Sequence, residues 1–284
     1  MSLLIIGGDS LIGKSLQRAC SEGGLPYCAT SRRDSMAGDM LKWDFEDEPS
    51  TWRIPLAARV AVICAATTGL ADCESNPQRG RKINVEAPTL IARILQERGL
   101  FVIFLSTSLV FGGQRAAAKW NDPLQPETVY GKQKAEAEAG IMATGPRVAI
   151  LRVTKVVHPG LRLFTNWANC LRGGITIEPF SDMVFSPVPV KWVTDTILEI
   201  ARALAPGIFQ LSGDRDITYA DAAALLAFHI AAPVSLIRPR SWRTAGLNIS
   251  FAPSHATLTP RLPEGKTMHG QTVVETLGAI FDHL

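Results

Sequence analysis

Tyr130 and Lys134 are separated by one helical turn in the segment Tyr130-Gly131-Lys132-Gln133-Lys134. Residues at positions i and i+4 of a helix lie on the same face, so a helix here brings the phenol and the ammonium together. An ammonium beside a phenol stabilises the phenolate and lowers the tyrosine pKa from about 10. Such a tyrosine can exchange a proton with a substrate oxygen near neutral pH. The alternative is an exposed helix face, because this spacing also arises by chance.

A row of hydroxyl side chains precedes this segment, at the end of an apolar run. Phe101 to Leu105 has the character of a buried strand, and Ser106, Thr107 and Ser108 follow it. In open α/β sheets ligands bind at the carboxyl ends of the strands, where a hydroxyl can hydrogen-bond the same substrate oxygen. Serines and threonines also simply end strands, but their combination with Tyr130 and Lys134 in this order predicts a proton-transfer site.

The elements that must position these groups alternate between strand and helix. Continuous apolar runs predict buried strands, and apolar residues at helical spacing predict the helices between them. The expected strands are 2–6, 26–30, 60–65, 101–106 and 148–152, and the expected helices are 78–98, kinked at Pro88, and 127–144, with an earlier one that Gly23-Gly24 ends. This alternation predicts an α/β fold, a Rossmann doubly wound parallel sheet with helices on both faces.

A glycine-rich turn, residues 7–13, joins the first expected strand to the first helix. Glycines there allow a tight turn and a close approach of the backbone to a pyrophosphate, and the helix N-terminus offers free N–H groups. An ordinary strand-to-helix turn is the alternative, but the position after a buried strand favours a dinucleotide site. The cofactor contacts expected from this loop are Gly7, Asp9, Ser10, Leu11, Ile12 and Gly13.

The end of the second strand indicates the kind of dinucleotide. NAD sites usually place an acidic residue there, whereas this chain reads Thr30-Ser31-Arg32-Arg33. Two guanidinium groups beside hydroxyls suit the 2′-phosphate of NADP. We therefore expect NADP(H), held by Ser31, Arg32 and Arg33, with NAD as the less favoured cofactor and an exposed basic turn as the alternative. Asp44 either contacts the adenine amino group or caps a turn.

The second half of the chain has a looser pattern, with more prolines and less regular alternation. We expect residues 1–152 to form the NAD(P)-binding Rossmann domain and residues 153–284 a smaller, discontinuous α/β substrate cap that closes over the cofactor. The stretch 188–212 is expected to rejoin the first sheet, because a helical stripe over 190–204 precedes a short apolar run over 208–211.

The composition excludes several other functions. A net charge of +3, with 46% hydrophobic and 19% charged residues, argues against nucleic-acid or membrane-surface partners and against disorder. No apolar run approaches the ~20 residues of a membrane span, and no basic region of a signal peptide precedes the first strand. The five cysteines and the histidines lack metal-ligand spacing, so we expect no metal, and reduced thiols in a cytoplasmic protein.

The order of these motifs resembles the extended (atypical) short-chain dehydrogenase/reductase superfamily, also called the NAD-dependent epimerase/dehydratase superfamily, and within it the dTDP-4-dehydrorhamnose reductase branch. The resemblance is strong over residues 1–152 and thinner afterwards. It rests on the glycine loop, Ala65-Ala66-Thr67, Cys73-Glu74-Ser75-Asn76-Pro77, Ile83-Asn84-Val85-Glu86-Ala87-Pro88, residues 105–113, Val129-Tyr130-Gly131-Lys132-Gln133-Lys134 and Phe185-Ser186-Pro187-Val188.

The resemblance implies a reductase that passes a hydride from nicotinamide to a ketone carbon. Tyr130 would be the general acid, Lys134 would hold the nicotinamide ribose and lower the Tyr130 pKa, and Thr107 would hydrogen-bond the carbonyl oxygen. Asn84 would lie near the cofactor and order a water. The remaining cofactor contacts implied are Ala65, Ala66, Thr67 and Ser106.

Three departures from the family pattern bear on the ligands. Ser10 replaces the middle glycine of the loop, where its hydroxyl either bonds a phosphate or caps the helix. Ser108 stands where the reductase branch usually has an acidic residue, and residues 153–155 stand where it often has an aromatic one. The last two fall where the family holds its substrate, so the keto substrate stays open, a nucleotide-linked sugar being one candidate.

Two other functions stay open. An NAD-dependent sugar-nucleotide epimerase or dehydratase is disfavoured because Ser108-Leu109 lacks the Asp-Glu pair usual in dehydratases, and because epimerases usually prefer NAD. A non-catalytic NADP(H)-binding regulatory protein is disfavoured because such relatives often lose the tyrosine or the lysine. A homodimer is also open, since the apolar stripe of Leu90, Ile91 and Leu95 suits either a core or an interface.

Overall fold

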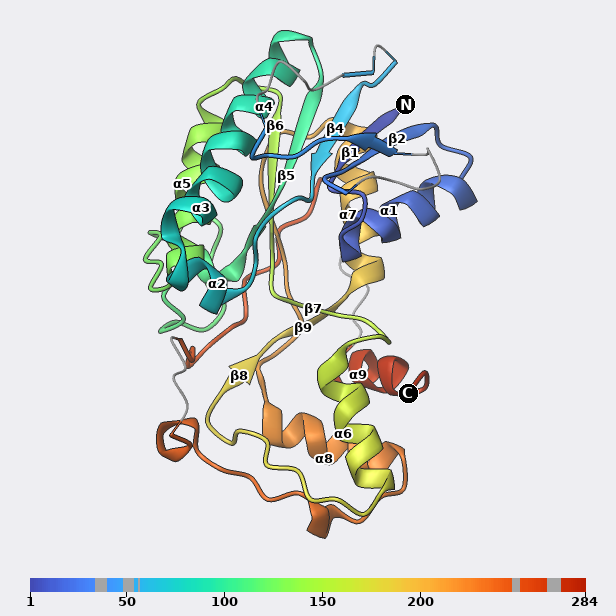
Figure 1. Cartoon of the computed structure of the whole chain (residues 1–284), viewed down its shortest axis with the longest axis vertical. Helices are drawn as coiled ribbons and strands as arrows, with labels where there is room; N and C mark the ends of the chain where they lie inside the picture. The colour runs from blue at the N-terminus through green and yellow to red at the C-terminus, as the bar shows by residue number, and fades with distance from the viewer. Residues whose placement is uncertain (34–39, 48–53, 56, 247–250, 265–271) are drawn as a thin grey trace.

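A parallel sheet of seven strands, in the order β10-β6-β5-β4-β1-β2-β3, forms the centre of the computed structural model (Figure 1). The structure describes residues 1–33, 40–47, 54–55, 57–246, 251–264 and 272–284. The strands are β1 (Leu3–Ile6), β2 (Tyr27–Ser31), β3 (Met40–Lys42), β4 (Val60–Ile63), β5 (Phe101–Thr107), β6 (Val148–Val153) and β10 (Gly207–Leu211). This sheet confirms the expected doubly wound α/β fold.

Helices cover both faces of the sheet, because alternate side chains of each strand point to opposite faces. Leu3 and Ile5 of β1 join one buried cluster with α1 and α7, whereas Leu4 and Ile6 join another with α4 and α5. Figure 1 shows these helix pairs on opposite sides of the strands. The helices of this part are α1 (Leu11–Glu22), α2 (Leu70–Ser75), α3 (Pro77–Arg81), α4 (Ala87–Glu97), α5 (Val129–Met142) and α7 (Val190–Ala203).

The helix expected over 78–98 has a π-helical turn, η2 (Lys82–Glu86), between α3 and α4. The N–H of Ala87 donates to the carbonyl of Lys82, one residue further back than in an α-helix. This wider turn ends two residues before Pro88, which has no N–H to donate, and it is the irregularity that the structure has where a kink was expected. The next helix, α5, begins after Thr128, whose hydroxyl accepts from the N–H of Gly131, and not at Glu127 as expected.

The residues beyond β6 form a smaller group of elements around a separate hydrophobic cluster. Figure 1 shows them below the sheet, connected to it through β7 and β9. The elements are β7 (Lys155–Val157), α6 (Arg162–Arg172), β8 (Val184–Phe185), β9 (Pro187–Pro189), β11 (Ile217–Thr218), α8 (Tyr219–His229), α9 (Val273–Phe281) and the short 3-10 turns η4 (Val234–Leu236) and η5 (Trp242–Thr244). Another 3-10 turn, η3 (Ser108–Val110), directly follows β5 of the sheet.

Two later segments return to the sheet. β10 pairs in parallel with β6, and α7 packs on α1, where Thr194 donates to the Ser15 hydroxyl at 2.8 Å. The segment around Arg261 forms an antiparallel bridge with Gln210 of β10. None of the described helices has the length and apolar character needed to cross a bilayer.

The stripe at Leu90, Ile91 and Leu95 divides between core and surface. Ile91 and Leu95 are fully buried against the sheet, whereas Leu90 is 37% exposed. Two of the three apolar residues therefore belong to the core, and only Leu90 is offered to a partner.

A buried ion pair ties β6 to α5. Arg152, 2% exposed, donates to both carboxylate oxygens of Glu138, with the closest contact at 2.6 Å. Its remaining N–H groups reach the Trp120 carbonyl at 2.9 Å and the Gln210 side chain at 3.3 Å. Because the charges are paired and the other donors are satisfied, burial costs little here; removing one partner would leave a buried charge unpaired.

We expect Glu138→Ala to lower the free energy of unfolding by about 3–5 kcal/mol, because the Arg152 charge would stay buried without its partner. Urea denaturation of the two proteins measures the difference. Asp195→Ala, which breaks the exposed pair between Lys191 and Asp195, is the control and should cost at most about 1 kcal/mol. Equal costs for the two variants would contradict this account of α5.

Candidate active site

A cavity of about 540 Å³ opens at the carboxyl ends of β1, β2 and β4. This volume lies in the range of small-molecule and cofactor sites. Ten of the expected cofactor contacts line it: Gly7, Asp9, Ser10, Ser31, Arg32, Arg33, Asp44, Ala65, Ala66 and Thr67. Six others do not: Leu11, Ile12, Gly13, Ser106, Tyr130 and Lys134.

The glycine loop forms one wall of this cavity. Gly7 has a φ of +86°, and a Cβ there would lie 2.7 Å from the Ala65 nitrogen. A Cβ on Gly13 would collide with the Gly7 carbonyl oxygen, so Gly13 acts by packing the helix close to the strand. The Ser10 hydroxyl donates to the Gly7 carbonyl at 2.7 Å and accepts from the Gly13 N–H at 3.0 Å. Ser10 therefore caps α1 and closes the turn at the position where the family usually has a glycine.

The end of β2 contributes the basic wall. The Thr30 hydroxyl accepts from the Gly7 N–H at 3.2 Å, and the Ser31 hydroxyl accepts from the Arg33 N–H at 3.0 Å. Arg33 is 74% exposed and contacts Asp9 across a single 3.7 Å ion pair. The hydroxyls of Thr30 and Ser31 thus bind backbone N–H groups, while the guanidinium groups of Arg32 and Arg33 lie at the cavity, where they could bind an anionic group.

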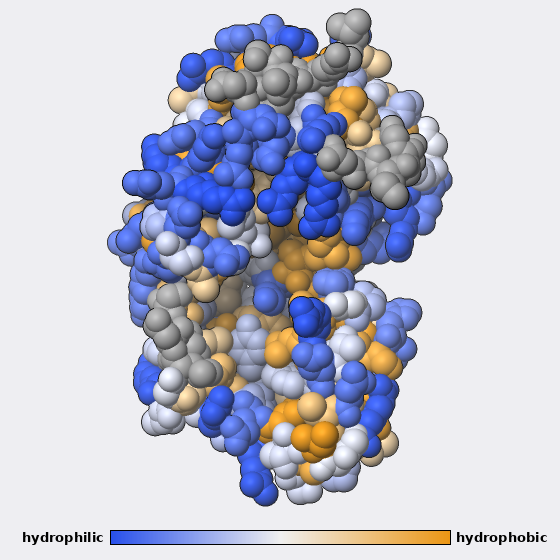
Figure 2. All heavy atoms as spheres, viewed as in Figure 1, coloured by the Kyte–Doolittle hydropathy of each residue, from blue (hydrophilic) through white to orange (hydrophobic). Residues whose placement is uncertain are grey.

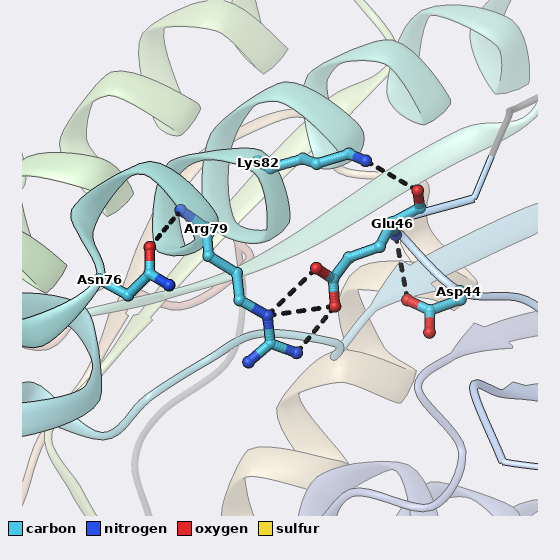
Figure 3. A network of polar contacts seen from close by, with 5 residues as sticks. All are labelled: Asp44, Glu46, Asn76, Arg79 and Lys82. Carbon is cyan, nitrogen blue, oxygen red and sulfur yellow. Dashed lines mark hydrogen bonds and ion pairs between the residues drawn. The ribbon is translucent and has the colours of Figure 1, made fainter.

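A polar network lies at the cavity, which three of its members line: Asp44, Asn76 and Arg79 (Figure 3). Asp44 accepts from the Glu46 N–H at 3.0 Å, which makes it a turn cap on the cavity wall. Glu46 accepts three hydrogen bonds from Arg79 at 2.7–3.2 Å. Sequence reasoning missed Arg79 at the cavity, because a solvated helix start is the ordinary reading of the basic residues there. Other lining residues that it missed are Trp43, Phe45, Asp72, Asn76 and Ile83.

Asn84, fully buried on the π turn, holds the loop after β4. Its amide oxygen accepts from the Thr67 N–H and its amide nitrogen donates to the Thr67 carbonyl, both at 2.9 Å. The amide nitrogen also donates to Gln133 of α5 at 2.8 Å. In the described structure Asn84 therefore positions the cavity loop against the helix that carries Tyr130 and Lys134, through contacts that the family resemblance did not specify.

Thr107, Tyr130 and Lys134 lie on β5 and α5, which pack together. The Thr107 hydroxyl accepts from the Leu109 N–H at 3.2 Å. Tyr130 is 8% exposed and Lys134 2% exposed, and the Lys134 ammonium lies 3.6 Å from the centroid of the Phe104 ring. The buried amine of Lys134 is therefore stabilised by a cation–π contact with Phe104.

The pKa of Tyr130 moves opposite to the sequence expectation. Burial of the hydroxyl, with a smaller contribution from Cys73, raises this pKa above its usual value of 10. The reason is that the Lys134 ammonium lies on Phe104, and no hydrogen bond joins it to the phenol among the described residues. Burial also lowers the pKa of Lys134 to about 7, although Glu138 and Cys64 act in the other direction.

Two buried hydroxyls at this edge have no hydrogen-bond partner in the described part of the chain: those of Ser106 and Thr154. Ser106 precedes Thr107, the last residue of β5, and Thr154 directly follows β6, which pairs with β5. A buried hydroxyl without a partner is costly, so such groups are usual where a ligand completes the bonding. Together with the glycine cradle, they make the sheet edge fit a dinucleotide that extends from the cavity toward Tyr130.

Lys134 makes folding stability depend on pH. The unfolded lysine keeps its proton up to about pH 10.5, whereas the folded one loses it near pH 7, so the unfolded state binds more protons between these values. The destabilisation of the folded state by the buried Lys134 amine has its full value below about pH 7 and falls as the pH rises toward 10.5. We expect Lys134→Met to be stabilising relative to the wild type near pH 6 and progressively less so up to pH 9, measured by urea denaturation. A difference between the two proteins that is constant with pH would contradict the lowered pKa.

Comparison with known proteins places the chain in a family. The sequence pattern of the RmlD substrate binding domain matches residues 1–259. A probable low-salt glycan biosynthesis reductase of Haloferax volcanii is 29% identical, over 78% of this chain and 77% of that protein. The dTDP-4-dehydrorhamnose reductase of Salmonella typhimurium is 24% identical, over 97% and 90%.

Solved structures agree with this placement. The dTDP-4-dehydrorhamnose reductase of Bacillus anthracis, crystallised with NADP, superposes with a TM-score of 0.85 at 17% identity, over 100% of this chain and 99% of that one. The resemblance seen in the motifs is thereby confirmed. This chain belongs to the RmlD substrate binding domain family and is similar to dTDP-4-dehydrorhamnose reductases.

Proposed function

We propose that this protein is an NADPH-dependent reductase that transfers a hydride to the keto group of a nucleotide-linked sugar, with Tyr130 as the proton donor. The observation that carries the proposal is the burial of Tyr130 and Lys134 beside the loops of the dinucleotide cavity. Cys73, which influences the Tyr130 hydroxyl, donates to the carbonyl of the cavity residue Thr67 at 3.4 Å. The proton donor and the cofactor cavity are therefore adjacent parts of one site.

The residues at the cavity suit NADPH. The loop of Gly7 and Ser10 would hold the pyrophosphate, and Ser31, Arg32 and Arg33 would hold the 2′-phosphate. The relative from Bacillus anthracis was crystallised with NADP, which supports the same choice here. NADPH, when bound, supplies the hydride, so the protein has to supply orientation and a proton.

The polar residues at the end of the sheet have distinct roles in the reduction. Thr107 donates a hydrogen bond to the ketone oxygen, and Tyr130 gives its proton to the same oxygen as negative charge develops there. The raised pKa keeps Tyr130 protonated before the reaction, as a general acid must be. The positive charge of Lys134, which is retained by part of the molecules at neutral pH, stabilises the phenolate that remains.

The region beyond β6 would hold the sugar nucleotide. We propose that residues 153–186 and 213–284 form the substrate cap, while 188–212 belongs with the sheet. Figure 2 shows the molecule hollowed between these two parts, with hydrophobic side chains at the hollow. Two of the relatives, from Mycobacterium tuberculosis and Salmonella typhimurium, are named dTDP-4-dehydrorhamnose reductases, which supports a nucleotide-linked keto sugar as the substrate class.

The state of the cysteines bears on the compartment in which this reaction takes place. The five cysteines are free, which suits the reducing cytoplasm, where we place the protein.

The exposed Leu90 lies in a groove between α4 and α5, and we assign this groove to a homodimer contact.

We expect Tyr130→Phe to lower the turnover of NADPH with dTDP-4-dehydrorhamnose at least ~100-fold, because the general acid is removed. Calorimetric affinity for NADPH should stay nearly unchanged, since the hydroxyl serves the substrate oxygen. Tyr27→Phe, at a half-exposed tyrosine on β2 that bonds only Ser21 among the described residues, is the matched control and should keep full turnover. Full turnover in Tyr130→Phe, or none in the wild type with any keto sugar nucleotide, would overturn the proposal.

A further inference from the structure

Arg79 lines the cavity far along the chain from the glycine loop, and its guanidinium is paired with Glu46. Arg79 lines the cavity together with Asp44, Phe45 and Ile83. Arg32, at the basic end of β2, lines the same cavity. Any dinucleotide seated by Gly7 and Arg32 therefore extends its adenosine end toward Arg79.

The orientation of the Arg79 side chain is fixed by Glu46. The Arg79 Nε donates to both carboxylate oxygens at 3.1 and 3.2 Å, and Nη2 donates to one of them at 2.7 Å. Both partners are held at their backbones as well: Asn76 accepts from the Arg79 N–H at 3.1 Å, and Lys82 donates to the Glu46 carbonyl at 2.7 Å. Figure 3 shows the guanidinium joined to the carboxylate along one edge. Such pairing fixes the plane of the guanidinium without covering its faces.

This pair is better suited to a neutral aromatic ring than to a phosphate. The Glu46 carboxylate offsets the Arg79 charge and would repel a phosphate dianion brought to the same place. A fixed, planar guanidinium stacks on aromatic faces. Phe45, 6% exposed, and the half-buried Ile83 add apolar surface to the same wall. By contrast, Arg33 is highly exposed and held by one long ion pair, so it can turn toward an anion.

We propose that Arg79, held flat by Glu46, stacks on the adenine ring of the cofactor and is a further cofactor-binding residue of this protein. The inference rests on the proposed function, since it places NADPH in the cavity. It divides recognition between two sets of residues. Arg79 and Glu46 bind the base, which NADPH and NADH share, whereas Arg32 and Arg33 bind the 2′-phosphate, which NADPH alone carries.

Calorimetric titration of the full chain with NADPH and with NADH tests this division. Arg79→Ala should weaken both nucleotides by the same factor, about tenfold, which corresponds to a stacking contribution within the usual range. Arg79→Lys keeps the charge but not the plane, so it should behave like Arg79→Ala. Arg32→Ala should weaken NADPH and leave NADH almost unchanged.

Arg81→Ala is the matched control, because Arg81 lies two residues along the same segment but pairs with Glu86 and Glu136 outside the cavity. It should change neither affinity. The inference is overturned if Arg79→Ala weakens NADPH alone, if Arg79→Lys restores affinity, or if both nucleotides bind the Arg79 variants as they bind the wild type. In these cases the proposed function stands. Failure of the wild type to bind either nucleotide would overturn the proposed function and this inference together.

Discussion

The polar residues on the buried face of α5 are the constraint on which the site depends. A helix that packs on a sheet normally buries apolar residues, but α5 buries Tyr130, Gln133, Lys134 and Glu138. Each needs a partner from another element, because unpaired buried polar groups are costly. Glu138 binds Arg152 of β6, Gln133 binds Asn84 of the π turn, and Lys134 lies on Phe104 of β5. These contacts allow α5 only one register and thereby place Tyr130.

The same contacts connect the proposed proton donor, Tyr130, to the cavity. Asn84 bonds both Gln133 and the backbone of Thr67, so the loop after β4 and α5 are held by one amide group. Lys134 forms no ion pair among the described residues, and burial lowers its pKa to about 7. In the proposed reaction its charge stabilises the phenolate of Tyr130, and this function would be the reason why a destabilising buried amine is kept at this position.

Much of this site could be predicted from sequence, because its signals are local. The glycines before α1, the basic end of β2 and the Tyr130–Lys134 spacing each lie within a few residues, and ten of the expected cofactor contacts line the cavity. The remainder depends on contacts across the fold. Arg79 meets Glu46 thirty-three residues away. The pKa of Tyr130 is raised because its hydroxyl is buried and because the Lys134 ammonium lies over the Phe104 ring. The spacing of the residues in the sequence reveals neither fact.

The most direct test of the central claim follows the hydride itself. The protein would be incubated with dTDP-4-dehydrorhamnose and NADPH carrying deuterium at nicotinamide C4, and the product would be analysed by mass spectrometry and NMR. The account predicts that one deuterium appears on the former ketone carbon when the label is on the transferred face of the ring. If neither face delivers deuterium to the sugar, while the protein still binds NADPH, the chain is a binding protein and the assignment of a reductase is wrong.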